Sequence, residues 1–284
     1  MDRTVTKKTI SGYIALSTMF FILFTSCWNK TKTPENTVYF DTIRIDEKRS
    51  SLIAGSKASI NCHLNIDFVY PNSYADVDVL QKMQSAFIER MFSVRYTGLS
   101  PKQATESFVK QYFSDFQSEK FSEEDYNLKD ESTFHYHLDL KNVITYNDKN
   151  LVSFLVETEI FEGGAHGSHS ACGYVFDLYT GEYITEESFA GTDYNKNLSD
   201  VIVRKIAEAN KVNDPKQLEN IGYNNIRDIV PNGNFTLDEK GITYYFNEYE
   251  IAAYFIGITK VFIPYDEFKI FITDDNPIAL VAKL

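Results

Sequence analysis

The sequence predicts an α+β fold in which antiparallel sheets pack against helices, in two closely associated subdomains. Some segments alternate apolar and polar residues with the period of two found in strands, and others repeat apolar residues at the three-and-four spacing of helices. The chain has 284 residues, of which 43% are hydrophobic and 15% aromatic, so it can bury one large core or two smaller ones. We expect a tether and first strand at residues 27–50, followed by subdomains at 51–160 and 161–284.

The N-terminal residues are typical of a secretory signal. A basic start precedes an apolar run over residues 13–24, and two small polar residues lead into Cys27. This layout resembles a bacterial lipoprotein signal at residues 1–26, with Cys27 as the lipidated first residue of the mature chain. An uncleaved anchor is the alternative, but the run is shorter than the ~20 apolar residues of a spanning helix. We expect a membrane-attached protein of the cell envelope, on the outer membrane or facing the periplasm.

The acidic balance restricts the partners. The formal net charge is −12, and removal of residues 1–26 with Asp2 and three basic residues would change it to −14. Nucleic acid and an anionic membrane surface would be repelled by this charge. A cationic partner would be attracted, although an acidic surface also serves solubility alone.

Two cysteines remain once Cys27 is lipidated, Cys62 and Cys172. An exported chain meets an oxidising compartment, so a disulfide between them is permitted and would stabilise the fold by ~4–5 kcal/mol in the chain-entropy model. Both cysteines nevertheless lie on alternating segments, where cysteine often serves as a small buried side chain. We favour two buried thiols and keep the disulfide as the alternative.

The first half alternates between strand and helix patterns. A strand is expected at residues 38–45, and residues 58–68 alternate throughout, with Cys62 among the apolar positions. Two amphipathic helices follow, over residues 75–96 and from Ser100 to Phe116. The second begins with serine as N-cap and proline in the first turn.

An acidic stretch and a histidine stripe follow the helices. Residues 121–131 predict a solvated connector, or alternatively a patch that meets a basic partner. Residues 132–146 return to period two and place His135, His137 and Asp139 on the outward face. Such a stripe can bind a metal if His63 lies on the adjacent strand. A polar outer face is also normal in an antiparallel sheet, so we expect neither a metal nor a cofactor.

The second half has its own ordered set of patterns. Its predicted elements are strands at 151–161 and 171–178, a turn at 179–182, a helix at 198–210, a short helical piece at 218–229, a hairpin of 235–237 with 242–246, a turn and central strand within 249–263, and a short final helix from Pro264.

The candidate binding site is the loop between the strands at 151–161 and 171–178. Its sequence is Glu162-Gly163-Gly164-Ala165-His166-Gly167-Ser168-His169. Three glycines in five residues allow positive φ and close approach of another chain or ligand. We assign ligand binding to Glu162, Gly163, Gly164, His166, Gly167 and His169, and no residue to catalysis.

Several segments carry a resemblance to a known family. They are the glycine loop, residues 176–182 (FDLYTGE), 235–237 (FTL), 249–254 (YEIAAY) and 261–265 (VFIPY). Together they resemble the extracytoplasmic domain of RsiV-like anti-sigma factors and the non-catalytic N-terminal domain of PdaC-like peptidoglycan deacetylases, over about residues 56–272. The resemblance implies an α+β envelope module, which binds lysozyme in RsiV-like proteins and accompanies a deacetylase domain in PdaC-like ones.

The chain also departs from both relatives. It ends at Leu284 without room for a deacetylase domain, and a lipoprotein signal takes the place of a sigma-binding segment. Deacetylase activity and sigma-factor control are therefore not expected to carry over. Only the binding module does.

Three functions follow as hypotheses. The first is a non-enzymatic, lipid-anchored envelope module that binds peptidoglycan fragments or a cationic wall-degrading protein such as lysozyme. The second is a metal-dependent hydrolase in which Glu162, His166 and His169 supply a base and metal ligands. Against it, a glycine loop lacks the helical scaffold of zinc proteases, and no serine or cysteine nucleophile signature accompanies the loop. The third is a periplasmic scaffold or assembly protein that uses an exposed aromatic surface. We expect the first.

Overall fold

The computed structural model describes residues 37–53, 58–119, 135–190, 194–273 and 276–282. The predicted signal at 1–26, Cys27 and the predicted acidic connector at 121–131 lie outside these described residues. Those three assignments therefore stay predictions.

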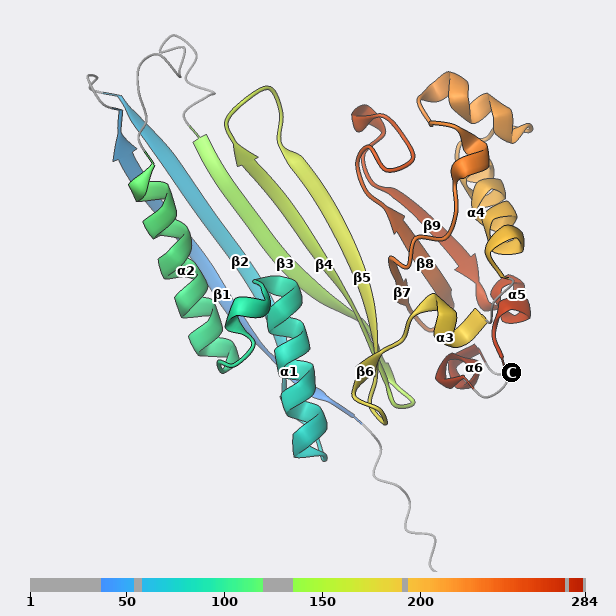
Figure 1. The fold of residues 1–284 in the computed structure, drawn as a ribbon, viewed down its shortest axis with the longest axis horizontal. Helices are drawn as coiled ribbons and strands as arrows, with labels where there is room; N and C mark the ends of the chain where they lie inside the picture. Colours follow the sequence, from blue (N-terminus) through green and yellow to red (C-terminus); the bar gives the residue numbers. More distant parts are fainter. Residues whose placement is uncertain (1–36, 54–57, 120–134, 191–193, 274–275, 283–284) are drawn as a thin grey trace, which may run out of the picture. The chain divides into compact units, whose positions relative to one another are not determined.

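The first half of the chain forms a six-stranded sheet in the order β1-β2-β3-β4-β5-β6 (Figure 1). The strands are β1 (Tyr39–Leu52), β2 (Ser59–Ser73), β3 (His135–Asp148), β4 (Leu151–Glu162), β5 (Ser168–Asp177) and β6 (Glu182–Tyr183). All neighbours are antiparallel except β2 and β3. These two are parallel because a helical crossover connects them.

The sheet has one apolar face, as the alternation predicts. The buried positions of β2 and β3 are Ile60, Cys62, Leu64, Ile66, Phe68, Tyr136, Leu138 and Leu140. The residues between them are exposed, such as Asn65 and His135, or half-buried, such as His63 and Asp139. The predicted strand patterns are therefore confirmed on both strands.

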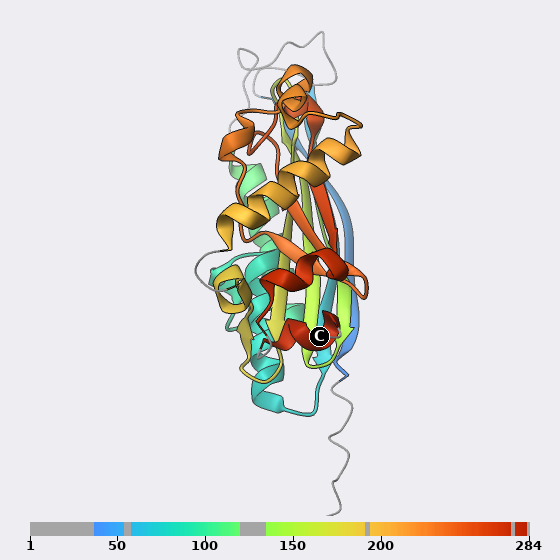
Figure 2. The same ribbon diagram turned by 90° about the vertical axis from the view of Figure 1, so that its right-hand side faces the viewer.

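Two helices cover this apolar face (Figures 1 and 2). They are α1 (Val77–Met91) and α2 (Pro101–Ser118), and a 3₁₀ helix at Val94–Tyr96 lies between them. Asp76 caps α1, and Ser100 with Gln103 forms a capping box at α2, which confirms the predicted serine cap. We call the opposite face of the sheet the open face, because these helices leave it uncovered.

The second half builds a smaller sheet with its own helices. Its elements are α3 (Glu186–Ala190), α4 (Asn195–Ala209), 3₁₀ helices at Pro215–Ile221 and Ile226–Asp228, β7 (Phe235–Leu237), β8 (Gly241–Phe246), a 3₁₀ helix at Tyr254–Ile256, β9 (Thr259–Pro264), α5 (Tyr265–Phe268), a 3₁₀ helix at Lys269–Phe271 and α6 (Pro277–Ala282).

The strand order in this sheet corrects one prediction. The order is β7-β8-β9, so β8 is central and β9 is an outer strand of the sheet. The expected central strand within residues 249–263 is therefore wrong. Its apolar character comes from Val261 and Ile263, which are buried against the helices of this half.

The two sheets meet along β5. A Cβ atom on Gly173 would collide with the backbone carbonyl of Phe235 on β7, so only glycine allows this approach. Asn234 accepts from the Gly173 N–H at 2.7 Å and donates to the Ala171 carbonyl at 2.8 Å. Asn247 accepts from the Ala171 N–H at 2.8 Å. Asparagine side chains thus bond the β5 backbone where no strand pairs with it.

The register of β5 also corrects the predicted subdomain boundary. Ile160 on β4 pairs with Ser168 on β5, so a division at residues 160/161 would cut a hairpin of the first sheet. The change from one sheet to the other follows β6 instead. Among the helices of the described residues, none is both long and apolar enough to span a membrane.

Candidate functional site

The glycine loop connects β4 to β5 and turns on two glycines. Gly163 has φ of +84° and Gly164 has φ of +92°, values that other residues adopt only with strain. Glu162, Gly164 and His166 are exposed. The chain therefore forms the tight, exposed loop that the sequence predicts.

An aromatic column supports this loop from the second half of the chain. The His166 ring stacks on Tyr254 with 4.1 Å between centroids. The Tyr249 ring is stacked with Tyr254 at 5.7 Å, and its hydroxyl lies 3.5 Å from His166 Nε2. The Tyr254 hydroxyl donates to the Gly167 carbonyl at 2.9 Å. Residues 247–258, between β8 and β9, and the glycine loop therefore form one unit, which we call the loop pair.

His169, three residues after His166, contacts acidic side chains instead of the aromatic column. Its backbone N–H donates to Glu248 Oε2 at 3.0 Å, and its Nδ1 lies 2.7 Å from Glu248 Oε1. Its Nε2 lies 3.7 Å from Glu159 Oε1, which is also 3.3 Å from Nε2 of His137. The Glu248 side chain is only 7% exposed, so this carboxylate acts as a fixed bracket between β5 and the loop pair.

The structure brings together only some of the predicted site residues. Gly163, Gly164, His166 and Gly167 belong to the loop pair, while His169 faces the sheet and contacts Glu248. His166 and His169 therefore do not face a common site at which both could bind one ligand. Sequence reasoning missed Glu248 and Tyr254 as partners, because some 80 residues separate them from the loop. The aromatic YEIAAY segment was the available signal.

The histidine stripe points outward as predicted. His135, His137 and Asp139 lie on the open face, and His63 pairs directly with His137 on the neighbouring strand. His63 Nε2 lies 2.8 Å from Asp46 Oδ1. In the described ranges no three histidine, cysteine or acidic side chains are placed to hold a metal ion.

The alternative of a Cys62–Cys172 disulfide is wrong in this structure. Both thiols are free, and β3 and β4 separate the strands that carry them. Neighbouring strands lie ~4.8 Å apart, so three strand spacings exceed the reach of a disulfide. Burial raises the pKa of both thiols, which disfavours the thiolate that a nucleophile requires.

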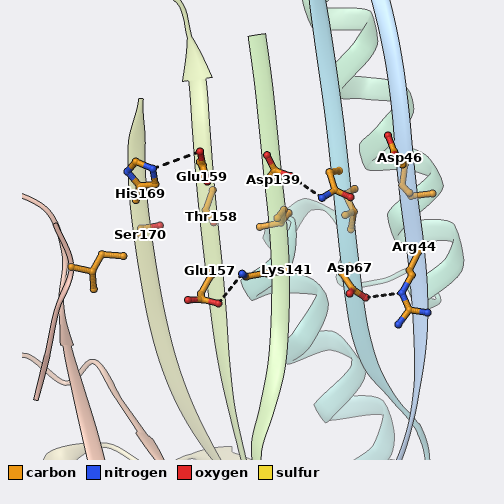
Figure 3. Close-up of a pocket in the computed structure, with 15 residues that line it drawn as sticks. Arg44, Asp46, Asp67, Asp139, Lys141, Glu157, Thr158, Glu159, His169 and Ser170 are labelled. Atoms are coloured by element: carbon orange, nitrogen blue, oxygen red, sulfur yellow. Dashed lines mark hydrogen bonds and ion pairs between the residues drawn. The ribbon is translucent and has the colours of Figure 1, made fainter. Parts of the chain in front are cut away.

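The open face carries polar side chains in straight cross-strand rows (Figure 3). One row, which we call the carboxylate row, runs over five strands because its members pair directly in register: Asp46, Asn65, Asp139, Glu159 and His169. The row beside it, which we call the alternating row, consists of Arg44, Asp67, Lys141 and Glu157. Both rows line a hollow of about 640 Å³ that Ile258 of the second half borders.

The two rows differ in their charge balance. In the alternating row Arg44 pairs with Asp67 at 3.4 Å and Lys141 with Glu157 at 3.3 Å. In the carboxylate row, Asn65 donates to Asp139 at 2.7 Å. No lysine or arginine of the described chain forms an ion pair with any of its three carboxylates. The carboxylate row is therefore the part of the open face that keeps its negative charge.

Comparisons with known proteins agree with this two-part architecture. Residues 57–169 match the family model described as Deacetylase PdaC, and residues 186–266 match a protein family of unknown function, DUF3298. No protein with a curated description matches the chain.

Two solved structures share the fold. A DUF3298 family member from Bacteroides fragilis NCTC 9343 has 27% identity and a TM-score of 0.76, with 88% of this chain and 98% of that chain covered. A DUF3298 family protein from Pseudomonas aeruginosa PAO1 has 15% identity and a TM-score of 0.56, with 83% and 95% covered. The chain thus combines a PdaC-like region at residues 57–169 with a DUF3298-like region at residues 186–266, and it resembles solved DUF3298 family members over most of its length.

Proposed function

We propose that this protein is a lipid-anchored binding module of the cell envelope that recognises a cationic wall-degrading protein, such as lysozyme, through its loop pair. Cys27 would carry the anchor. The single observation that carries the proposal is an exposed, acidic and internally braced pair of loops with aromatic side chains at its surface.

The side chains of the loop pair suit a protein partner. Tyr249 is 60% exposed and Phe255 is 75% exposed, although both are large aromatic residues. Such side chains are enriched among the residues that dominate protein–protein binding energies. They provide a contact surface on an otherwise polar part of the molecule.

The charge of the same region suits a basic partner. Residues 162–169 and 247–258, which form the loop pair, contain three glutamates and no lysine or arginine. Complementary charge accelerates encounter and favours one class of partner over others. Nucleic acid and anionic lipid headgroups are disfavoured by the same charge.

The bracing of the loops supports binding more than catalysis. The Tyr254 stack and the Glu248 bracket hold the loops in one arrangement, which lowers the entropy lost on binding. His166 and His169 contact separate partners. A shared metal or proton-transfer site between them would require these contacts to be rearranged.

The test is calorimetric titration of the purified protein with lysozyme and, separately, with purified muropeptides, at low and high salt. We expect saturable lysozyme binding that weakens with salt, and roughly tenfold or greater weakening by Tyr249→Ala with Phe255→Ala. Tyr39→Ala with Tyr179→Ala is the matched control, because these tyrosines are 66% and 70% exposed but lie elsewhere. If the protein binds muropeptides but not lysozyme, its ligand is a peptidoglycan fragment and not a cationic protein. If it binds neither, the proposed function is overturned.

A further inference from the structure

We propose that the open face of the six-stranded sheet is a second part of the same interface, where the carboxylate row binds lysine and arginine side chains of the cationic partner. This inference rests on the proposed function and extends it from the loop pair to a surface that sequence reasoning did not assign. The occupant is the basic surface of the partner protein.

The charge of the carboxylate row is complementary to that of a basic partner. Asp46, Asp139 and Glu159 lie on one line over β1, β3 and β4, and no lysine or arginine of the described residues neutralises them. The alternating row beside them is internally paired. A basic partner would thus find negative charge concentrated along one line, flanked by a row that is already balanced.

The carboxylate row is continuous with the loop pair. The carboxylate row ends at Glu159 and His169, and His169 is bracketed by Glu248 of the loop pair. Ile258, at the end of the loop pair, borders the same hollow. A partner that contacts Tyr249 and Phe255 can therefore extend onto the open face without leaving the protein surface.

The carboxylates of the row are regularly spaced across the strands. Strand separation of ~4.8 Å places Asp139 and Glu159 about 5 Å apart along the row, and Asp46 about 10 Å from Asp139. The Asn65 amide positions Asp139, and His63 contacts Asp46. Two of the three carboxylates thus have fixed contacts before the partner arrives; Figure 3 shows the residues of the row side by side. A partner with basic side chains at comparable spacing would meet all three.

The expected contribution is mainly electrostatic. These carboxylates remain partly hydrated, and exposed ion pairs are individually weak. Long-range attraction from a row of like charges acts mostly on the association rate, and it is screened by salt. The open face is therefore expected to increase the rate of capture, whereas the aromatic loop pair slows dissociation.

The experiment measures association and dissociation rates with lysozyme for a triple variant, Asp46→Asn, Asp139→Asn and Glu159→Gln. Its control is Glu106→Gln, Glu187→Gln and Asp200→Asn, which removes the same charge from exposed positions on α2, α3 and α4. We expect the triple variant to lower the association rate at low salt by about tenfold, with the control within about twofold. The difference should shrink at high salt, and lysozyme with succinylated lysines should not distinguish the variants.

Each outcome separates this inference from the proposed function. If the triple variant and its control behave alike while the Tyr249 and Phe255 variant loses binding, the open face has no role and the loop pair stands. If the triple variant weakens binding while the aromatic variant does not, the open face carries recognition and the loop-pair assignment is overturned. If the unmodified protein does not bind lysozyme at all, both proposals are overturned for this ligand.

Discussion

Glu248 holds His169 at two points, accepting from its backbone N–H at 3.0 Å and contacting its Nδ1 at 2.7 Å. The carboxylate is 7% exposed, so little water competes for it. One side chain from the β8–β9 segment thereby fixes both the backbone and the imidazole ring of His169 on β5.

Removal of this bracket is expected to loosen the loop pair. Glu248→Ala leaves the part-buried N–H group of His169 without its acceptor, which is expected to cost ~1 kcal/mol of the free energy of unfolding. Hydrogen exchange should accelerate at the amides of residues 169–171 and across residues 247–257. Glu187→Ala, at an exposed position on α3, is the control and should change neither. Unchanged exchange at His169 would contradict the role assigned to Glu248.

Gly173 is expected to be irreplaceable. Gly173→Ala forces β5 and β7 apart at the Phe235 carbonyl, and overpacking of this kind typically costs ~1–3 kcal/mol of unfolding free energy. Gly98→Ala is the matched control, because a Cβ there meets no atom within 4 Å. Chemical denaturation of both variants measures the difference. Equal stability of the two would show that the sheets do not meet as closely as described.

Glu267 is expected to give a pH-dependent contribution to stability. Hydrogen bonds from Lys205 and Arg204, each at 2.6 Å, lower the pKa of this carboxyl in the folded protein. Its stabilising contribution is therefore complete above the unfolded value of about 4.3 and is lost as pH falls through the lower folded value. Glu267→Gln should reduce the unfolding free energy by up to ~1 kcal/mol at pH 7.

The control for Glu267 is the same comparison at low pH. The difference between the two proteins should shrink as pH falls below about 4, because both then carry a neutral side chain. A difference that stays constant down to pH 3 would place the effect of the substitution in packing rather than in charge.

Cys62 and Cys172 are expected to be free and slow to react. Alkylation of the unfolded protein without reductant, followed by mass measurement, should label both. In the folded protein the same reagent should react slowly, because burial raises the pKa of both thiols and restricts access. A mass two hydrogens lower, without labelling, would restore the disulfide.

The local elements were predictable because their causes are local. The alternation of residues 58–68 exposes a period of two, and Ser100-Pro101 carries its own cap and start signal, so β2 and α2 follow from their own residues. The glycine loop was equally visible. Positive φ at Gly163 and Gly164 is a property of those residues and needs no distant partner.

The site's partners and the strand order were not predictable in this way. Glu248 meets His169, and Tyr254 meets His166, through the packing of the second sheet on β5, which no spacing in the sequence encodes. The carboxylate row likewise exists only because five strands align in register. The boundary at residue 161 failed for the same reason, since the pairing of β4 with β5 is decided by the whole sheet.

The asparagine contacts along β5 have a consequence for how the two halves depend on each other. Asn234 and Asn247 occupy hydrogen-bonding groups of Ala171 and Gly173 that would otherwise be a free sheet margin. The unpaired edge of a strand is a template with which other extended chains can pair. A chain cut after β6 would therefore be expected to self-associate through β5. In the intact protein, the second half covers this edge and prevents such pairing.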